Sequence, residues 1–392
     1  MLSRMKTLYI DTKNALQEFC AEIANCSWLA IDTEFMREKT FYPELCLIQI
    51  GTSELTACID PLRLDDLDDL LDVLYNKDIT KVVHAGGQDM EIFYHLRGDL
   101  PQPIFDTQLA APLLGHPEQA GYARLVEDIL GVNLKKIHTR ADWAHRPLTA
   151  AQIEYAADDV IYLVKIYQIL LDQLQQRQRL SWLDADFSHL TDPRRYENPP
   201  ELAWKRVKSV NRLRGSQLST LQALAEWREQ RAQQENIPRG WLIKDDVLID
   251  MAKQRPSSLE TLGRVRGLGD RTVKRRGQEL LEIIESGMQR QPQLLPEHIK
   301  SKKLNHDQEA VVDLMSALVH IRATENDLNP ALLVSRKQLQ KIAGGEGIEE
   351  TLSGWRYKIL GEELQNLLDG NTCIGLDQGK LKFVTTELIK KE

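Results

Sequence analysis

The sequence of 392 residues is 42% hydrophobic and 28% charged, with a formal net charge of −8 and a sequence isoelectric point near 5.7. This size and composition predict two or three domains with sizeable cores, and they exclude wholesale disorder. No apolar run approaches the roughly 18 residues of a membrane span, no signal peptide opens the chain, and the five cysteines form no Cys-x-x-Cys pair. We therefore expect a soluble cytoplasmic protein without disulfides or structural zinc.

Charge is distributed unevenly along the chain. Residues 1–190 contain 17 Lys and Arg against 29 Asp and Glu, whereas residues 201–290 contain 18 against 12. Residues 291–392 are close to neutral, with 13 against 15. An acidic first half is typical of a protein with several cation ligands, and a basic middle segment is typical of one that binds a polyanion such as nucleic acid.

The first 185 residues predict an α/β domain. Short apolar runs bounded by turn residues predict strands at residues 29–31, 45–50, 55–59 and 81–84. Because the polar turn at residues 51–54 separates the second run from the third, we expect an antiparallel meander to open the sheet.

Helical periodicity and capping residues predict the helices of this domain. They are expected at residues 65–75 and 89–96, from Phe105-Asp-Thr107 onwards, and from Thr149 to about Arg177. Asp106 or Thr107 is expected to cap the third of these helices. Thr149 and Gln152 have the spacing of a capping box for the last one.

The second half of the chain predicts helices and two linkers. After the α/β domain at 1–185, the expected order is a linker at 186–211, a helical domain at 212–290, a linker at 291–300, a helical domain at 301–375 and a tail at 376–392. The helical segments resemble each other at offsets of 91 and 84 residues, as in Lys274-Arg-Arg-Gly-Gln-Glu-Leu280 and Lys358-Ile-Leu-Gly-Glu-Glu-Leu364. This order indicates a duplicated module, although generic amphipathic helices would produce part of the similarity.

Acidic side chains follow or flank the apolar elements of the α/β domain. Asp32 and Glu34 are two apart at a strand, so their side chains share one face. Asp159 lies four residues after Tyr155 on the long helix, again on one face. With Asp89, these acids suffice to hold two hard divalent cations, which stabilise the attacking and leaving oxygens of a phosphodiester displacement. Clustered carboxylates without cations would repel one another.

Each motif also has a structural interpretation. Asp89 is expected near a helix N-terminus, where a carboxylate commonly caps backbone N–H groups. Tyr155 is equally suited to packing, and a single His84 at a strand end is more often part of a hydrogen-bonded structure than a ligand. The acidic run at residues 65–69 is expected to be a solvated helix start.

The motifs together resemble the DEDD-family 3′→5′ exonucleases, specifically the ribonuclease D family. The first motif is Ile31-Asp-Thr-Glu-Phe35. The second combines His84-Ala-Gly-Gly-Gln-Asp89 with Phe105-Asp-Thr107, and the third is Tyr155-Ala-Ala-Asp-Asp-Val160, in the tyrosine variant. Two further matching stretches are residues 40–50 and 142–148. The helical modules resemble HRDC (helicase and RNase D C-terminal) domains.

The resemblance implies a ribonuclease H-like exonuclease domain, a mixed sheet flanked by helices, followed by two all-α HRDC-like domains. It also implies two divalent cations, Mg²⁺ or Mn²⁺. Asp32 would bridge both, Glu34 and Asp159 would complete the nucleophile-side site, and Asp89 would hold the second cation. Tyr155 would orient the attacking water, and nucleoside 5′-monophosphates would leave from the 3′ end.

Residues that would contact RNA are predicted in three groups. Phe35, Phe41 and Tyr42 are candidates for stacking on terminal bases, although packing against the sheet is an equal alternative. In the loop before the long helix, candidates for phosphate contacts are Lys135, Lys136 and Arg140, although a solvated charged loop is the alternative and is favoured for two of the three. In the first helical module, candidates around the Gly-Leu-Gly turn are Arg264, Arg266, Arg271, Lys274 and Arg275.

We therefore expect a monomeric, metal-dependent 3′→5′ exoribonuclease that trims structured RNAs, and the resemblance implies precursors of tRNA with single-stranded 3′ tails. A DNA exonuclease that uses the same acids is one alternative, which the response to the terminal 2′-OH would distinguish. A catalytically silent RNA-binding module is another alternative, and it would bind RNA without releasing mononucleotides.

Overall fold

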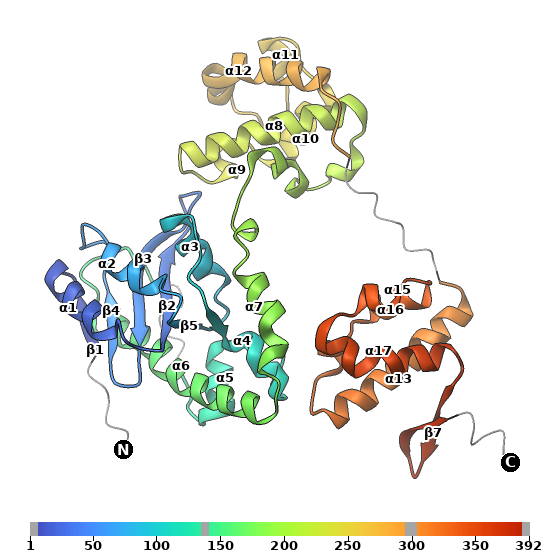
Figure 1. The fold of residues 1–392 in the computed structure, drawn as a ribbon. Helices are drawn as coiled ribbons and strands as arrows, with labels where there is room; N and C mark the ends of the chain where they lie inside the picture. Colours follow the sequence, from blue (N-terminus) through green and yellow to red (C-terminus); the bar gives the residue numbers. More distant parts are fainter. Residues whose placement is uncertain (1–6, 135–140, 295–303, 386–392) are drawn as a thin grey trace.

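A six-stranded mixed sheet forms the centre of the α/β domain (Figure 1). The computed structural model describes residues 7–134, 141–294 and 304–385. The strands are β1 (Thr7–Ile10), β2 (Trp28–Met36), β3 (Glu44–Gly51), β4 (Thr56–Ile59), β5 (Thr80–Val83) and β6 (Ile104–Asp106). Their spatial order is β1-β4-β3-β2-β5-β6; β2, β3 and β4 pair antiparallel, and the other pairs are parallel. The expected meander is thus confirmed, but it lies in the middle of the sheet.

Helices cover both faces of this sheet. The helices of the domain are α1 (Lys13–Ile23), α2 (Asp68–Leu74), α3 (Gly87–Arg97), α4 (Thr107–Ala110), α5 (Tyr122–Leu130), α6 (Ala150–Gln176) and α7 (Asp184–Leu190). Helices α1, α2 and α3 share one core with Ile31 and Ile50, whereas α6 packs with Ala30 and Val82 on the other side. The two faces are therefore closed by different hydrophobic cores, and α6 belongs to the face that carries the site described below.

Local sequence signals explain the ends of the long helix. Helix α6 begins after Thr149, whose side chain accepts a hydrogen bond from the backbone N–H of Gln152 in the predicted capping box. Asp106 caps α4 by accepting from the N–H of Gln108, as predicted. Strands β1 and β6 and helices α1, α5 and α7 were not predicted, and Phe105, expected at a helix start, lies in β6. Strand β1 has only four residues and pairs with β4 alone, so its sequence carries little periodicity.

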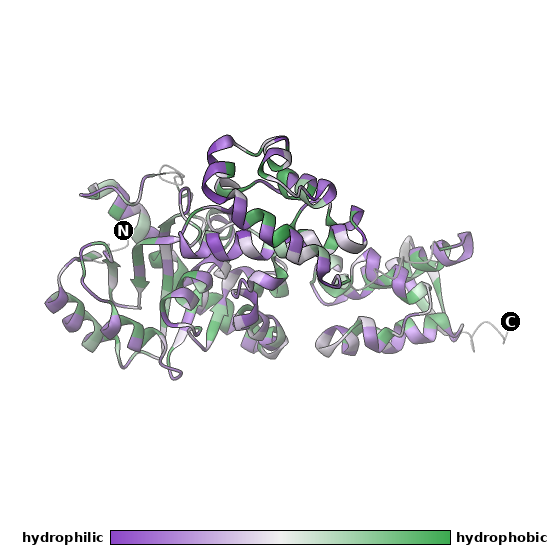
Figure 2. Ribbon diagram, turned by 90° about the horizontal axis from the view of Figure 1, so that it is seen from above, coloured by the Kyte–Doolittle hydropathy of each residue, from purple (hydrophilic) through white to green (hydrophobic). Residues whose placement is uncertain are grey.

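Two helical units follow, each with five helices in the same order of lengths: long, short, medium, short, long. The first contains α8 (Gly215–Gln234), α9 (Arg239–Leu242), α10 (Asp245–Gln254), α11 (Leu259–Gly263) and α12 (Asp270–Gln289). The second contains α13 (His306–Glu325), α14 (Pro330–Leu333), α15 (Arg336–Ala343), α16 (Ile348–Thr351) and α17 (Gly354–Leu368). The common order supports the predicted duplication. Hydrophilic residues cover the outward sides of these helices in Figure 2.

The segments expected to be a linker and a tail contain regular structure. Between α7 and α8 there are short 3₁₀ helices at Pro193–Arg195, Pro200–Arg206 and Val210–Arg212. Trp204, 1% exposed, packs into the core of the first helical unit, so this part of the segment belongs to that unit. After the second unit, β7 (Thr372–Asp377) and β8 (Lys380–Thr385) form an antiparallel hairpin. The domain boundaries themselves stay predictions.

The second helical unit contacts the α/β domain through a stacked aromatic pair. The rings of Trp182 and Trp355 lie 4.5 Å apart at 6°. Beside them, the guanidinium of Arg179 donates to the carbonyl oxygens of Leu113 and Asn326, each at 2.6 Å. Because Leu113 lies in the α/β domain and Asn326 follows α13, Arg179 joins the two units. Within the described ranges, the helices are all too short or too polar to cross a membrane.

Candidate active site

Three of the predicted carboxylates meet beside strand β2. Oxygen atoms of Asp32, Glu34 and Asp159 all lie within 4.8 Å of one another. Asp32 and Glu34 share one face of β2 because they are two residues apart, and Asp159 comes from α6, which packs on that face. Residues 127 positions apart in the chain are thus brought to one point, on the same side of the sheet.

Burial and mutual repulsion make this cluster unfavourable without a cation. Burial, followed by the charge of Asp159, raises the pKa of Asp32 well above its usual range. Burial and the same neighbour raise the pKa of Glu34 to about 8, and burial with the charge of Asp158 raises the pKa of Asp159 to about 7. Carboxylate oxygens are the ligands that Mg²⁺ and Mn²⁺ prefer, and a bound cation reverses the repulsion. The three residues therefore fit a divalent cation.

Asp89 lies beside these three carboxylates. It occupies the first turn of α3, and its Oδ1 accepts a hydrogen bond of 2.5 Å from the hydroxyl of Thr33, the residue between Asp32 and Glu34. Burial raises the pKa of Asp89 to about 6, although the Thr33 hydroxyl opposes the shift. The charge of Asp89 in turn contributes to the raised pKa of Asp32 and of Glu34. Its carboxylate is thus electrostatically part of the site.

A tight turn positions Asp89. Between β5 and α3, the carboxylate of Asp106 accepts hydrogen bonds from the N–H groups of Ala85 and Gly86, at 3.0 and 2.9 Å. A Cβ atom at Gly86 would lie 2.5 Å from the side chain of Val83, so only glycine fits there. His84 contacts Thr107 and the carbonyl of Ala120 with its two ring nitrogens, at 3.0 and 3.1 Å. His84 therefore has the structural role that was the more common expectation.

Tyr122, which was not predicted, holds the turn of α6 that carries Asp159. Its hydroxyl donates to the carbonyl oxygens of Asp159 and Asp158, at 2.5 and 3.1 Å. Burial raises its pKa well above the usual range, so the phenol stays protonated as a donor. Gly51 permits the close approach of α6 to β3, since a Cβ there would lie 3.1–3.2 Å from Val160 and Val164. The sequence around Tyr122 gives no signal for this role.

Tyr155 lies one helical turn before Asp159 and packs beside Trp143, with their ring centres 6.2 Å apart. Trp143 belongs to the predicted motif at residues 142–148. In the same motif, Arg146 forms a two-pronged ion pair with the buried Asp60, at 2.6 and 2.8 Å, and donates to the carbonyl of Cys46 at 2.7 Å. This motif therefore ties the segment before α6 to strands β3 and β4, and it places Trp143 against Tyr155.

Gln49 is a second residue that the sequence analysis missed. It is the cross-strand partner of Asp32, so its side chain is on the same face of the sheet. The side chain is fully buried, and neither its oxygen nor its nitrogen has a hydrogen-bond partner among the described residues. Buried amides normally have partners, so the amide of Gln49 is available to a water, an ion or a substrate at the site beside Asp32.

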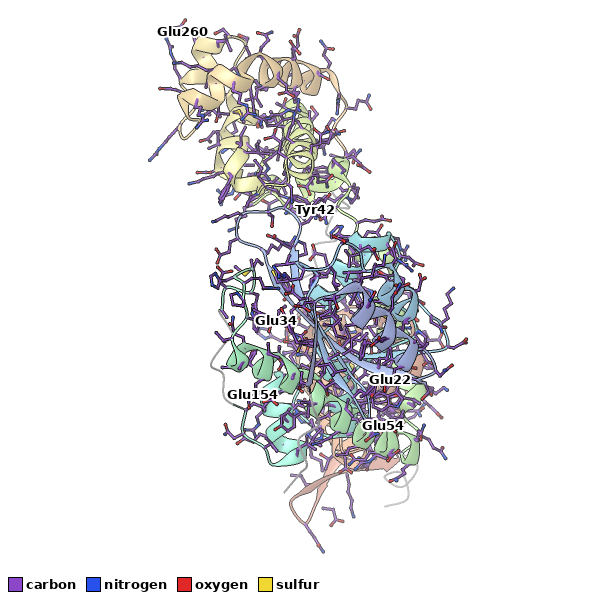
Figure 3. The ribbon with its side chains drawn as sticks, turned by 90° about the vertical axis from the view of Figure 1, so that its left-hand side faces the viewer. Glu22, Glu34, Tyr42, Glu54, Glu154 and Glu260 are labelled. Carbon is purple, nitrogen blue, oxygen red and sulfur yellow. The ribbon has the colours of Figure 1, made fainter. Side chains whose placement is uncertain are left out.

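The predicted base-stacking aromatics border the first helical unit. Phe41 is 3% exposed, and the guanidinium carbon of Arg239 lies 4.5 Å from its ring centre, so Phe41 offers no open face to a base. Tyr42 is half-buried, with its ring 4.4 Å from that of His95, and Phe35 is half-buried at the end of β2. Figure 3 shows Tyr42 at the junction of the two units and Glu34 further inside the α/β domain.

The predicted basic contacts are only partly described. Lys135, Lys136 and Arg140 lie outside the described residues. Around the Gly-Leu-Gly turn, the exposed cations are Arg264, Arg266, Arg271, Lys274 and Arg275. Arg264 pairs with Glu260 at 2.5 Å, and Asp270 occupies the first turn of α12, where it opposes an anion at that helix N-terminus. The acidic run at 65–69 is a helix start whose Asp66 pairs with Lys13 at 2.9 Å.

The fold and the comparisons define a 3′–5′ exonuclease domain followed by an HRDC domain and a further helical unit. A family model for 3′-5′ exonucleases matches residues 8–175, and a model for the HRDC domain matches residues 217–284. Ribonuclease D of Sphingobium indicum is 41% identical over 388 residues, which cover 97% of this chain and 99% of that protein. Ribonuclease D of Zymomonas mobilis is 40% identical and covers 98% of both chains.

A solved structure extends this similarity to the whole fold. The crystal structure of Escherichia coli RNase D, described as an exoribonuclease involved in structured RNA processing, has a TM-score of 0.78 and 33% identity. The match covers 93% of this chain and 99% of that one. The chain therefore belongs to the ribonuclease D family, and the predicted 3′→5′ exoribonuclease activity is confirmed at the level of the family.

Proposed function

We propose that Asp32, Glu34, Asp89 and Asp159 hold two divalent cations, Mg²⁺ or Mn²⁺, against the 3′-terminal phosphodiester of an RNA. The observation that carries this proposal is the convergence of three half-buried carboxylates within 4.8 Å, each with a raised pKa. Bound there, the cations would stabilise the charge that develops on the attacking and leaving oxygens. Because α6 packs on β2, these two elements would hold the carboxylates in position for both cations.

Tyr155 orients the attacking water in this proposal. It lies one turn before Asp159 on the same helix, and packing against Trp143 limits the positions of its ring. A phenol of pKa near 10 is a poor general base at neutral pH, so its contribution is to position the water. In-line attack then breaks the bond to the 3′ oxygen of the penultimate nucleotide and releases a nucleoside 5′-monophosphate.

The substrate class in this proposal is a structured RNA with a single-stranded 3′ tail, such as a tRNA precursor. Support comes from the Escherichia coli relative, which acts in structured RNA processing, and from the excess of basic residues over 201–290. The enzyme is proposed to act as a cytoplasmic monomer.

The experiment uses RNA labelled at its 5′ end, with a hairpin body and a short 3′ tail, incubated with Mg²⁺ with and without chelator. A ladder that shortens from the 3′ end, with 5′-monophosphates as products and complete inhibition by chelator, is expected. A DNA exonuclease would degrade a tail of deoxynucleotides at the same rate, and a silent binding module would leave the label at full length. Either result would contradict the proposal.

A further inference from the structure

A basic groove opens on the first helical unit. Its volume is about 630 Å³, and its walls come from the 3₁₀ segments at 200–206 and 210–212, from α9 and from α10. The cationic side chains that line it are Arg206, Lys208, Arg212, Arg228, Arg239, Lys244 and Lys253. None of these was among the predicted RNA contacts.

The groove carries more positive than negative charge. Seven cationic side chains line it. Asp245, Asp246, Asp250 and the buried Glu229 beneath them carry four negative charges, so three positive charges are not balanced. Lys208, Arg212, Lys244 and Lys253 are exposed, and their side chains form no ion pair in the described parts of the chain. These four side chains are therefore available to a polyanion.

Buried ion pairs form the floor of the groove. Glu229 is fully buried and pairs with both Arg206 and Arg239. Arg228, 4% exposed, donates to the carbonyl of Ile243 and to Asp245, each at 2.8 Å, while its Nε has no partner among the described residues. Paired arginines fixed in this way form a preorganised positive surface, which costs little side-chain entropy when an anion binds.

An exposed tryptophan borders this surface. Trp241 is 63% exposed on α9, directly after Gly240 and three residues before Lys244, both of which line the groove. Exposed tryptophan next to unpaired cations is the combination by which proteins bind unpaired nucleotides, since a base stacks on the ring while cations hold the phosphates. An acidic peptide would use the cations but would leave the indole without a planar partner.

The groove borders the loop that follows the acidic strand β2. Arg239 lines the groove and also covers the ring of Phe41, which lies in the loop between β2 and β3. That loop follows Glu34 at the end of β2.

We propose that this groove binds an unpaired segment of the RNA substrate, with its phosphates on Lys208, Arg212, Lys244 and Lys253 and one base stacked on Trp241. The inference rests on the proposed function and assigns the contact to this groove instead of the Gly-Leu-Gly turn before α12. It makes the first helical unit a determinant of affinity for long substrates.

The first test measures RNA affinity of the full chain by fluorescence anisotropy over a range of salt concentrations, in chelator. The double variant Lys244→Ala/Lys253→Ala is expected to bind a tailed hairpin RNA at least fivefold more weakly. The slope of log affinity against log salt should fall by about 1.4, because each phosphate that a lysine no longer neutralises lowers it by about 0.7. The matched control, Lys337→Ala/Lys358→Ala, removes two exposed lysines of the second unit and should change neither value.

Equal losses in both double variants would overturn the proposal, as would a larger loss in Arg271→Ala/Lys274→Ala at the α12 turn. Hydrolysis of a dinucleotide separates this failure from failure of the proposed function. If the wild type releases mononucleotides from the dinucleotide but the groove variant binds long RNA normally, only the groove assignment is wrong.

The second test addresses stacking. Trp241→Ala should weaken binding of the tailed RNA about fivefold or more, whereas Trp241→Phe should retain most of the affinity because a flat ring remains. Binding should quench part of the tryptophan fluorescence of the wild type and less of that of Trp241→Phe. Equal affinity of Trp241→Ala and wild type, or binding of a poly-glutamate peptide in preference to RNA, would contradict the inference.

Discussion

Asn236 accepts a hydrogen bond from the backbone N–H of Phe41 at 3.1 Å, although 195 residues separate the two along the chain. The same Oδ1 atom accepts a second bond from the N–H of Tyr42, also at 3.1 Å. Asn236 adopts a positive φ of 47°, a conformation that asparagine tolerates better than most residues. The first helical unit thereby holds the loop that follows β2 through a residue outside the exonuclease domain.

Replacing Asn236 by Ala should loosen this loop. The two backbone N–H groups would lose their acceptor, which should lower the free energy of unfolding by about 1–3 kcal/mol. We expect kcat on a short oligonucleotide to fall several-fold, with faster hydrogen exchange at residues 37–43. Asn236→Asp is the control, since its carboxylate still accepts both bonds. If both variants kept wild-type kcat and exchange rates, the loop would not depend on Asn236.

Divalent cations should stabilise the protein more at higher pH. Burial raises the pKa values of Asp89, Asp159 and Glu34 to about 6, 7 and 8, above their ordinary values of 3.8 and 4.5. Groups with a raised folded-state pKa contribute stability below their unfolded pKa, and they lose it as pH rises through the folded value. The metal-free protein should therefore become less stable between about pH 4 and pH 8.

Thermal melts with chelator or with saturating Mg²⁺ measure this effect. A cation that binds only the folded state at about 100 times its Kd adds about 2.7 kcal/mol, which corresponds to a rise in Tm of roughly 5–10 °C. The rise should be large at about pH 8 and small at about pH 5.5, because protonated carboxyls do not bind the cation. The same rise at both pH values would contradict the electrostatic account of the acidic site.

Gln49→Leu should stabilise the protein and reduce its activity. The buried amide of Gln49 has no partner among the described residues, so an apolar side chain of similar size removes an unfavourable desolvation. We expect Tm to rise slightly and mononucleotide release to fall about tenfold, because the amide faces the site beside Asp32. Thr56→Val is the control: the hydroxyl of Thr56 is equally buried and unpartnered, but β4 carries none of the acids. Full activity in Gln49→Leu would show that the amide has no part in catalysis.

Tyr122→Phe should displace Asp159 without altering its charge. The variant loses the hydroxyl that donates to the Asp159 and Asp158 carbonyls. We expect a loss of about 1 kcal/mol of stability and a larger proportional fall in kcat than in affinity for RNA, since the ring still fills its cavity. Steady-state kinetics with a short oligonucleotide separate the effect on kcat from the effect on KM. A change confined to KM would indicate that Tyr122 contacts the substrate instead of supporting Asp159.

Simple periodicities predicted which acids share a face, and the resemblance to the exonuclease motifs singled these acids out as a site. Asp32 and Glu34 share a face through the two-residue period of a strand, and Tyr155 and Asp159 through the four-residue spacing of a helix. The capping box at Thr149 sets the first residue of α6, and it therefore sets the position of Asp159 along this helix. These signals are local, so each was visible in the sequence alone.

The supporting contacts were not predictable because they join distant segments. Nothing around Tyr122, Gln49 or Asn236 distinguishes them from ordinary polar or packing residues, and only the packing of α6, β3 and α8 gives them their roles. For Phe41, the sequence left base stacking and packing as equal alternatives, and the structure favours packing. An aromatic residue in a loop near the acids is typical of base stacking, but Arg239, distant in sequence, covers its ring.

Mn²⁺ binding and RNA hydrolysis, measured on the same preparations of Asp159→Asn and Asp158→Asn, test the central claim most directly. The two acids are adjacent on α6, but only Asp159 lies within 4.8 Å of Asp32 and Glu34. Asp159→Asn should bind Mn²⁺ at least tenfold more weakly and release no mononucleotides while it still binds RNA. Asp158→Asn should retain most of both activities. Equal Mn²⁺ affinity and undiminished hydrolysis in Asp159→Asn would show that these carboxylates are not the catalytic metal site.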